Sequence, residues 1–336
     1  MTRRAGVSPR RASIKDVAIL AGVSVGTVSN VLNKPSFVTE PTRLRVEQAM
    51  ADLQFVRNGT ARQLRAGHSL TVGVVVLDLA NPFYTELARG IEDRLASEEH
   101  LLMLCSSDED PERERRYLRQ FVEQGVRGIL ITPFQTTPEW FSELSSLRTP
   151  FVLLDTHSTD LPSVGVDNVE GARLAVDHLL AAGHRRIGLV NGPADLQQCR
   201  DRATGAEAAV TARGLDEREV LVRAQLREMN ADSGAAAVAG LLDAHPDLTA
   251  LFCVNDTVAL GALRELRIRG VDVPQQVAVV GYDDVPLAKE LRVPLTSVRQ
   301  PMHDIGWRAA DMLLTQQTEH VSFVPELIVR ASSDVR

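Results

Sequence analysis

After residue 70 the sequence alternates short apolar segments with longer amphipathic ones, and this alternation constrains the fold most strongly. Apolar strands separated by helices are typical of parallel sheets that helices cover on both faces. The expected strands are residues 72–77, 101–104, 128–131, 151–154, 186–190, 219–222, 250–254 and 277–280. The expected helices include residues 85–98, 113–124, 169–182 and 203–213. So many strands predict two similar α/β lobes, with a boundary near Asp167 and a return crossing near Gln300.

The composition is that of a globular protein with sizeable cores. Of the 336 residues, 44% are hydrophobic and 24% are charged, which excludes a mostly disordered chain. No apolar run reaches the ~18 residues of a membrane helix. No apolar segment follows the basic first residues, as it would in a secretory signal. The three cysteines form no CxxC pair, so we expect reduced thiols, no metal site and a cytoplasmic location.

The net charge of −7 hides an asymmetry between the two ends of the sequence. Residues 1–70 contain eleven lysines and arginines and only four acids, so this segment carries a charge of +7. The remaining residues carry −14. A small basic head on an acidic body is typical of a protein whose head binds a polyanion such as DNA.

The basic head has the pattern of a helix-turn-helix. Ser13 and Asp16 form a capping-box variant that opens a first helix, and Gly22 suits its left-handed end. Ser24 then caps a second helix over residues 25–32, and Thr39 caps a third that has a proline in its first turn. The residues expected on the inner faces are Val28, Val31 and Leu32 of the second helix and Leu44, Ala49 and Leu53 of the third.

Two helices joined by a tight glycine turn place the second helix in a major groove. Its outward residues are Val25, Gly26, Thr27, Ser29, Asn30 and Asn33. The short hydrogen-bonding side chains of Thr27, Ser29 and Asn33 suit phosphate oxygens. Val25 suits a thymine methyl group and Asn30 suits adenine, whereas Gly26 offers no side chain for readout. Taken alone, the pattern also fits an ordinary three-helix bundle without a DNA role.

Two longer motifs resemble the LacI/GalR family of bacterial transcription regulators. Residues 18–33 read AILAGVSVGTVSNVLN, and residues 57–65 read RNGTARQLR, with Asn-Gly where this family usually has Pro-Asn. The resemblance implies a small all-α helix-turn-helix DNA-binding head, a hinge helix, and an α/β periplasmic-binding-protein type I body with two parallel-sheet lobes. It also implies that Leu64 enters the minor groove as an apolar wedge, although Leu64 could instead pack within a linker helix. The DNA-binding residues that it adds are Ser13, Ser24, Thr42, Asn58, Ala61, Arg62 and Leu64.

The same resemblance implies a division of the chain. We expect a DNA-binding domain over residues 1–57, a hinge helix and linker over 58–69, and an effector-binding and dimerisation domain over 70–336. Lobe 1 would comprise about 70–167 and 300–324, and lobe 2 about 168–299 and 325–336. A symmetric wedge at the centre of palindromic operator DNA needs two copies, so we expect a homodimer. The last residues of the sequence contain no heptad repeat of the kind that would indicate a tetramer, so we expect a dimer and not a tetramer.

Polar residues follow several of the expected strands, where ligands of parallel α/β sheets lie. Carboxylates, amides and an arginine in a cleft suit a neutral polyol, with an aromatic face against the sugar ring. By their resemblance to pentose-binding members of this fold, the effector-binding candidates are Asn81, Phe83, Tyr84, Asp155, Arg202, Asn255, Asp283 and Gln300. Thr156 stands where ribose binders have an arginine, which weakens the case for ribose itself.

Each candidate also has a plainer explanation. Phe83 and Tyr84 could belong to the core, and Asn255 and Asp283 could cap helices or join the lobes. We expect Asp256 to cap the helix that begins near residue 258.

The sequence therefore predicts a DNA-binding transcriptional regulator, most simply a repressor, that responds to a small sugar-like effector. A nucleobase or a sugar phosphate is the alternative effector. No phosphate-binding glycine loop, nucleophile elbow or HExxH motif occurs, so we expect no enzyme, no cofactor and no metal. An enzyme on this fold, or a sugar-binding protein without a regulatory role, would have no need of the basic head.

Overall fold

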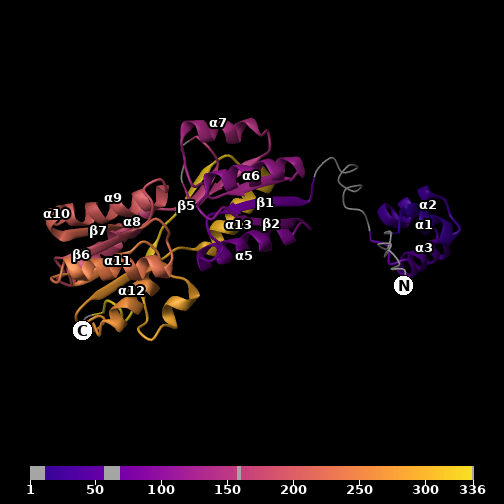
Figure 1. Cartoon of the computed structure of the whole chain (residues 1–336). Helices are drawn as coiled ribbons and strands as arrows, with labels where there is room; N and C mark the ends of the chain where they lie inside the picture. The colour runs from indigo at the N-terminus through magenta and orange to yellow at the C-terminus, as the bar shows by residue number, and fades with distance from the viewer. Residues whose placement is uncertain (1–11, 57–68, 157–159, 335–336) are drawn as a thin grey trace, which may run out of the picture. The chain divides into compact units, whose positions relative to one another are not determined.

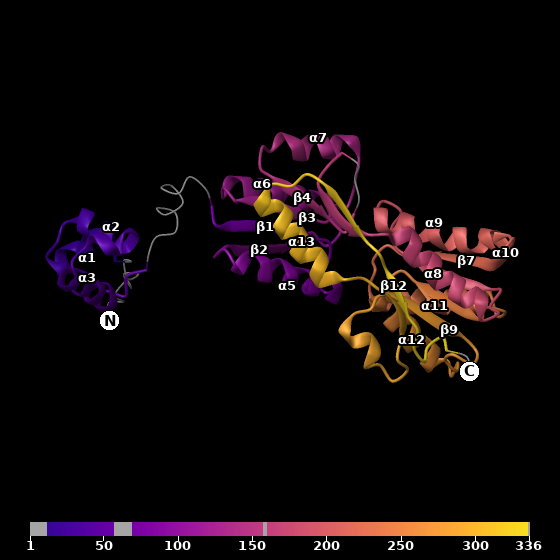
Figure 2. The ribbon, with the colours of Figure 1, turned by 180° about the vertical axis from the view of Figure 1, so that it is seen from behind.

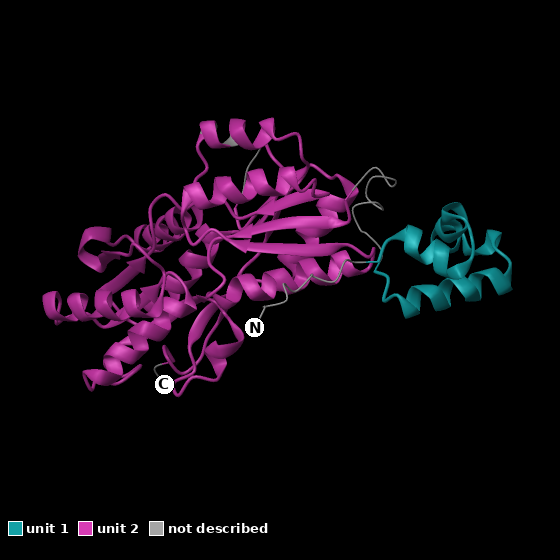
Figure 3. Cartoon of the chain, turned by 45° about the vertical axis from the view of Figure 1, so that its right-hand side comes forward, with its two compact units in different colours: residues 1–67 teal, residues 68–336 magenta. Residues whose placement is uncertain are grey.

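The structure is a computed structural model that describes residues 12–56, 69–156 and 160–334 (Figure 1). The chain forms two compact units, residues 1–67 and residues 68–336, which are coloured separately in Figure 3. We describe each unit by itself. No single helix in the described ranges is long and apolar enough to cross a membrane, and only α1 with α2, bent by 105°, meets that criterion as a pair.

Unit 1 contains a helix-turn-helix. Its described helices are α1 (Ile14–Ala21), α2 (Val25–Asn33) and α3 (Glu40–Asp52), with a 3-10 turn η1 (Pro35–Phe37). Ser13 and Asp16 form the expected capping box, in which the Ser13 backbone N–H donates to the Asp16 carboxylate at 2.8 Å. Gly22 ends α1 with a left-handed φ of 64°. Val17, Val28 and Val46, one from each helix, have no exposed surface and form the centre of the core.

The prediction that Leu44 lies on the inner face of α3 was wrong. Leu44 is 53% exposed, whereas Val46 is fully buried and Ala49 is 3% exposed. Two residues along a helix turn by about 200°, so Leu44 and Val46 cannot share a face. The true inner face continues with Met50 and Leu53, which pack against the same core.

Unit 2 contains two six-stranded sheets. We call the first sheet and its helices lobe 1, and the second sheet and its helices lobe 2. In spatial order the strands of lobe 1 are β11 (His320–Phe323), β5 (Ser163–Val166), β4 (Phe151–Leu154), β3 (Gly128–Ile131), β1 (Thr71–Val76) and β2 (Leu101–Ser106). Those of lobe 2 are β12 (Glu326–Ile328), β10 (Thr296–Arg299), β9 (Ala278–Asp283), β8 (Ala250–Cys253), β6 (Ile187–Asn191) and β7 (Leu221–Gln225). The pairings are parallel except for β10 with β12.

Helices follow most of the strands. Lobe 1 has α5 (Pro82–Ala96), α6 (Pro111–Glu123), α7 (Pro138–Ser146) and α13 (Met302–Thr315). Lobe 2 has α8 (Asn168–Ala181), α9 (Gln197–Ala212), α10 (Glu217–Val220), α11 (Ala231–Ala244), α12 (Asp256–Ile268) and the 3-10 turn η2 (Pro286–Lys289). The chain passes between the lobes after β5, after β10 and after β11 (Figure 2). The expected parallel two-lobed architecture is thus present.

Two glycines bring α5 and α13 into backbone contact. A Cβ at Gly90 would lie 1.9 Å from the His303 carbonyl oxygen, and one at Gly306 would lie 2.0 Å from the Leu87 carbonyl oxygen. These distances leave no room for a side chain, so the two helices lie side by side in both views (Figures 1 and 2). Such close packing makes α5 and α13 one rigid element. Asn81 and Gln300 stand at the start of its two helices.

Candidate functional site

The outward face of α2 carries the residues expected to contact DNA. Ser24 caps α2, because its Oγ accepts a hydrogen bond from the Thr27 N–H at 3.0 Å. Asn33 donates to the Ser29 carbonyl oxygen at 2.8 Å. Val25 is 41% exposed, and Asn30 and Gly26 are exposed as well. The two candidate base readers, Val25 and Asn30, are therefore accessible on the helix surface.

The other DNA-binding candidates differ in what their side chains contact. The Ser13 hydroxyl is engaged with the Asp16 carboxylate at 2.7 Å. The hydroxyl of Thr39 donates to that of Thr42 at 3.1 Å. The hinge candidates Asn58, Ala61, Arg62 and Leu64 lie outside the described residues.

The carboxylate of Asp283, at the end of β9, is the centre of a buried polar cluster where the two lobes meet, at the position of the cleft that the sequence predicts. Gln300 Nε2 donates to Asp283 Oδ1 at 2.7 Å. Asn81 Nδ2 donates to Asp283 Oδ2 at 3.5 Å, which joins lobe 1 to lobe 2. Arg202 Nη2 lies 3.9 Å from Asp283 Oδ1. Three of the sequence-predicted residues thus converge on the buried carboxylate of a fourth.

Arg202 is held by partners within lobe 2. Its Nε donates to Asn168 Oδ1 at 2.8 Å, and its Nη1 donates to the Val254 carbonyl oxygen at 2.6 Å. Its guanidinium lies 3.7 Å from the ring centroid of Tyr282, a cation–π contact. We did not single out Asn168 or Tyr282 from the sequence, although Tyr282 stands beside Asp283 in the Gly-Tyr-Asp-Asp segment.

Asp155 follows β4 in a conformation that non-glycine residues rarely adopt. Its φ is 50°, and that of Asp283 is 105°. Backbone strain of this kind clusters at binding and catalytic sites. Asp155 is 3% exposed, and its Oδ1 has no hydrogen-bond partner among the described residues.

Burial raises the pKa of both carboxyl groups. The pKa of Asp155 rises to about 7, mainly through loss of solvent, with a lowering contribution from Arg202 and a raising one from Asp283. The pKa of Asp283 rises to about 6, again through burial, and Arg202 and the hydrogen bonds from Gln300 and Asn81 oppose the rise. Both groups therefore titrate near neutral pH.

The aromatic pair at the start of α5 belongs both to the core and to the cleft. Phe83 and Tyr84 are buried and meet edge to face, with centroids 4.9 Å apart. Asn81 caps the helix by accepting the Phe83 N–H at 3.0 Å. The pKa of Tyr84 lies well above its ordinary value, chiefly through burial and then through Asp155 and Asp283. Tyr84 therefore lies near the carboxylates of the cleft.

The prediction that Asp256 caps the helix α12 was wrong. Asn255 caps α12, because its side-chain oxygen accepts the Val258 N–H at 2.8 Å. Asp256 is the first helical residue, and its carboxylate accepts from Ser297 Oγ at 2.6 Å and from the Val285 N–H at 2.9 Å. Asp256 thus ties α12 to β10, and the capping role that we allowed for Asn255 is real.

Two features of the cleft escaped the sequence analysis. Thr156 of lobe 1 donates to Gln197 Oε1 of lobe 2, a second bond between the lobes. Glu109, which follows β2, has a pKa of about 7 because of burial, with Asp78 and Glu228 as smaller causes. No local pattern marks these interactions, because the partners of Thr156 and Glu109 lie far away in the sequence.

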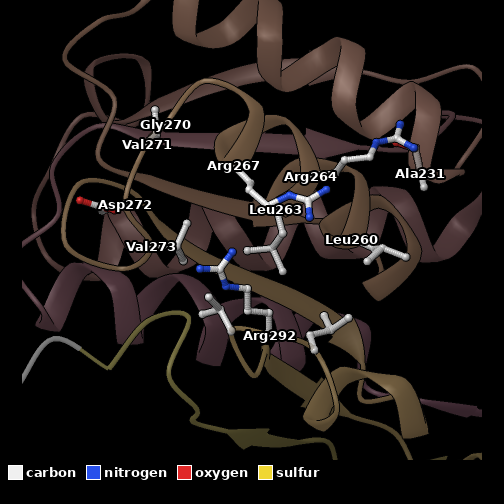
Figure 4. A pocket seen from close by; sticks show the side chains of 12 residues that line it. Ala231, Leu260, Leu263, Arg264, Arg267, Gly270, Val271, Asp272, Val273 and Arg292 are labelled. Atoms are coloured by element: carbon white, nitrogen blue, oxygen red, sulfur yellow. The ribbon is translucent and has the colours of Figure 1, made fainter.

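A separate hollow lies on lobe 2 (Figure 4). Its volume is about 660 Å³, and leucines and valines share its wall with Arg264, Arg267 and Arg292. None of the predicted effector-binding residues lines it. Within the described part of the chain, no group of histidine, cysteine, aspartate and glutamate side chains could hold a metal ion.

The fold and the site define a class: a two-lobed binding domain attached to a helix-turn-helix. Comparison with known proteins agrees. Residues 13–58 match the family model "Bacterial regulatory proteins, lacI family". Residues 69–325 match the model "Periplasmic binding proteins and sugar binding domain of LacI family".

Named relatives cover nearly the whole chain. The ribose operon repressor of Bacillus subtilis is 37% identical over 303 residues, which are 90% of this chain and 91% of that protein. The HTH-type transcriptional repressor PurR of Aliivibrio salmonicida is 32% identical over 331 residues, with 96% and 98% covered. The lac repressor dimer bound to operator and the anti-inducer ONPF superimposes with a TM-score of 0.86 at 28% identity, with 96% and 99% covered.

This chain belongs to the LacI family of bacterial transcriptional regulators. It is a DNA-binding regulator controlled by an effector, and it is not an enzyme.

Proposed function

We propose that this protein is a repressor that binds palindromic operator DNA as a homodimer in the cytoplasm, and that a sugar-like effector bound between the lobes of unit 2 changes its operator affinity. The observation that carries the proposal is the convergence of Asn81, Arg202 and Gln300 on Asp283. These residues come from both lobes, so a ligand that engages them also acts on the angle between the lobes.

The proposal assigns sequence readout to α2. Asn30 would pair with an adenine edge and Val25 would contact a thymine methyl group, while Ser24, Thr27, Ser29 and Asn33 would lie near phosphates. Leu64 would enter the minor groove at the centre of the operator. The repressor names of the relatives support this sense of regulation.

The chemistry of the cleft supports a polyol effector. Carboxylate, amide and guanidinium groups can each bond two neighbouring hydroxyls, and Phe83 and Tyr84 supply apolar ring surface beside them. The proposed contact residues are Asn81, Phe83, Tyr84, Asp155, Arg202, Asn255, Asp283 and Gln300. These are the residues that the sequence predicts, and their contact with a ligand stays a prediction that the experiments below test.

The proposal is tested in two steps with the full chain. Selection from a random DNA library should yield one two-fold-symmetric sequence, and Asn30→Ala should relax the preference at one position in each half-site. A thermal-melt screen should then give a shift with a neutral or substituted sugar, since ligand at 100 times its Kd stabilises by ~2.7 kcal/mol. The shift should disappear in Arg202→Ala and Asp283→Ala. A shift only with nucleobases or sugar phosphates, or one that survives both substitutions, would contradict the assignment of the cleft.

A further inference from the structure

Carboxylates outnumber cations around the cleft. The charged groups that act on Tyr84 are Asp155, Asp283 and Glu109, all acidic, and the single base Arg202. Asp201 adds another acid that acts on Asp155. A ligand between the lobes therefore meets more acidic groups than basic ones among the described residues.

Arg202 is poorly placed to receive an anionic ligand. Two of its nitrogen atoms already donate to Asn168 and to the Val254 carbonyl oxygen, and its face rests on Tyr282. It lies 3.9 Å from Asp283, so part of its charge already offsets that carboxylate. Arg202, the base that acts on Tyr84 among the described residues, is thus largely engaged by the protein itself.

Two unpaired atoms among the candidate effector-binding residues are acceptors. Asp155 Oδ1 and Gln300 Oε1 are buried and have no hydrogen-bond partner among the described residues. Asp155 is 3% exposed and Gln300 is 2% exposed, so the protein covers both side chains almost completely. A buried acceptor without a donor is costly, and a charged one most of all. The cleft therefore requires a ligand that donates.

A hydroxyl group can donate to either atom, but it leaves the charge of Asp155 uncompensated. An ammonium group donates three hydrogen bonds and carries the opposite charge. It fits the charge excess and the unpaired acceptors together, which a neutral or anionic group does not.

We propose that the effector carries a protonated amine among its hydroxyl groups, as an amino sugar does, and that Asp155 receives this amine. The inference rests on the proposed function, because it names the chemical class of ligand for the same cleft. The ligand enters as a cation and Asp155 binds it as a carboxylate. When Asp155 is protonated beforehand, its proton passes to the buffer on binding. The raised pKa of Asp155 agrees with a carboxylate whose burial is costly and for which a bound ammonium group would compensate.

The test is calorimetric titration of the full chain with matched sugars. The probes are glucosamine, galactosamine and mannosamine, their neutral parent hexoses, their neutral N-acetyl derivatives, and glucose 6-phosphate. One amino sugar should bind at least about tenfold more tightly than its parent and its N-acetyl derivative, as the loss of one charged hydrogen bond implies. Asp155→Asn should remove that preference. Asp247→Asn, which changes a surface acid that pairs with Arg186 in the same lobe as Arg202, should keep it.

A second measurement does not depend on the variant. At pH 6.5, binding enthalpies of the amino sugar to the unmodified chain in two buffers of different ionisation enthalpy should differ, because protons are released. A neutral parent or an N-acetyl derivative that binds as tightly as the amino sugar would overturn the inference and leave the sugar-regulated repressor intact. Tighter binding of glucose 6-phosphate would overturn it as well. Binding of none of these probes would overturn the inference, and a thermal-melt shift with nucleobases alone would then overturn the sugar effector too.

Discussion

Asp155 is the residue where binding and stability are expected to conflict. In the unfolded chain an aspartate has a pKa of about 3.9, whereas the folded chain raises that of Asp155 to about 7. Between these values the folded chain holds a proton that the unfolded chain has lost. The free energy of unfolding therefore falls as pH rises through this window, and the full cost is present above it.

Asp155→Asn should accordingly stabilise unit 2 at pH 8. Because one pKa unit corresponds to ~1.4 kcal/mol, we expect a gain of at least about 1 kcal/mol, or a rise of ~2–4 °C in Tm for a domain of this size. The gain should shrink at pH 4, where the carboxyl group is protonated in the folded chain. Thermal melts at the two pH values measure it. A variant that is less stable at pH 8 would show that the Asp155 carboxylate is compensated by partners of its own.

Ser13 and Thr39 offer a matched pair of caps in unit 1. The Ser13 side chain and the Asp16 carboxylate complete a capping box, whereas the Thr39 side chain caps no backbone N–H. Ser13→Ala should therefore destabilise α1 by ~1 kcal/mol, or about a fivefold change in its opening equilibrium. Thr39→Ala should have a smaller effect on α3. Hydrogen exchange of peptides from the full chain measures both, and equal acceleration in the two variants would contradict the cap assignment.

Sequence reasoning at the residue scale succeeded where one residue signals its own local bond. The capping of α1 and the left-handed Gly22 are of this kind. It failed where the role of a residue depends on its direction around the helix axis or on a partner that is distant in the sequence. Asn255 and Asp256 are both good caps, and the structure decides between them through Ser297, which no local pattern links to Asp256.

The paired helices α5 and α13 are the element on which both lobe 1 amides of the cleft depend. Gly306→Ala would place a methyl group 2.0 Å from the Leu87 carbonyl oxygen and force the helices apart. Overpacking of this kind typically costs ~1–3 kcal/mol. We expect a lower Tm and weaker effector binding, because Asn81 caps α5 and Gln300 lies two residues before α13.

Gly240→Ala is the matched control. Gly240 lies within α11, and nothing lies within 4 Å of its missing Cβ. The substitution should stabilise the helix by up to ~1 kcal/mol, because alanine is the better helix former. Thermal melts of both variants compare them directly. If Gly306→Ala were as harmless as Gly240→Ala, the two helices would not be in the close contact described.

At the element scale the longer apolar strands were predictable, whereas β5 and β10 inside the sheets and β11 and β12 at their edges were not. β1, β3 and β4 are apolar runs and appear where the sequence indicates them. β11 alternates exposed and half-buried positions, and β12 has only three residues, so neither gives a strong apolar signal. The segment at 219–222 was misplaced, because its first residues end the short helix α10 and β7 begins at Leu221.

The same limit applies to the tryptophans. The sequence predicts that Trp140 and Trp307 pack against neighbouring elements from their helices and do not form a sugar platform, since Trp307 lies at helical spacing with Leu313. Trp140 is buried, and its Nε1 donates to the buried Glu114 of α6 at 2.6 Å. Trp307 is 41% exposed, and the guanidinium of Arg94 in α5 lies 5.9 Å from its ring centroid. Spacing gives the face of a helix, but the neighbour that covers that face comes from the tertiary fold.

For the whole molecule, the charge asymmetry and the two motifs predicted the family, and the comparisons bear this out. They could not predict the bonds between lobes, because Asn81 and Asp283 are 202 residues apart. The proposed assembly is tested by sedimentation of the dilute full chain. We expect a mass of two protomers, and a mass near four would contradict a dimer.

Operator affinity measured with and without effector shows whether the site between the lobes controls DNA binding. Labelled operator from the selection is titrated with the full chain at fixed salt, in the presence and absence of the sugar that gives the largest thermal shift. Coupling of ~1–3 kcal/mol predicts a change of ~5–150-fold in Kd, and Arg202→Ala should abolish it while leaving operator binding without effector unchanged. An effector that binds the chain and leaves the operator Kd the same would contradict the claim that the cleft controls DNA binding.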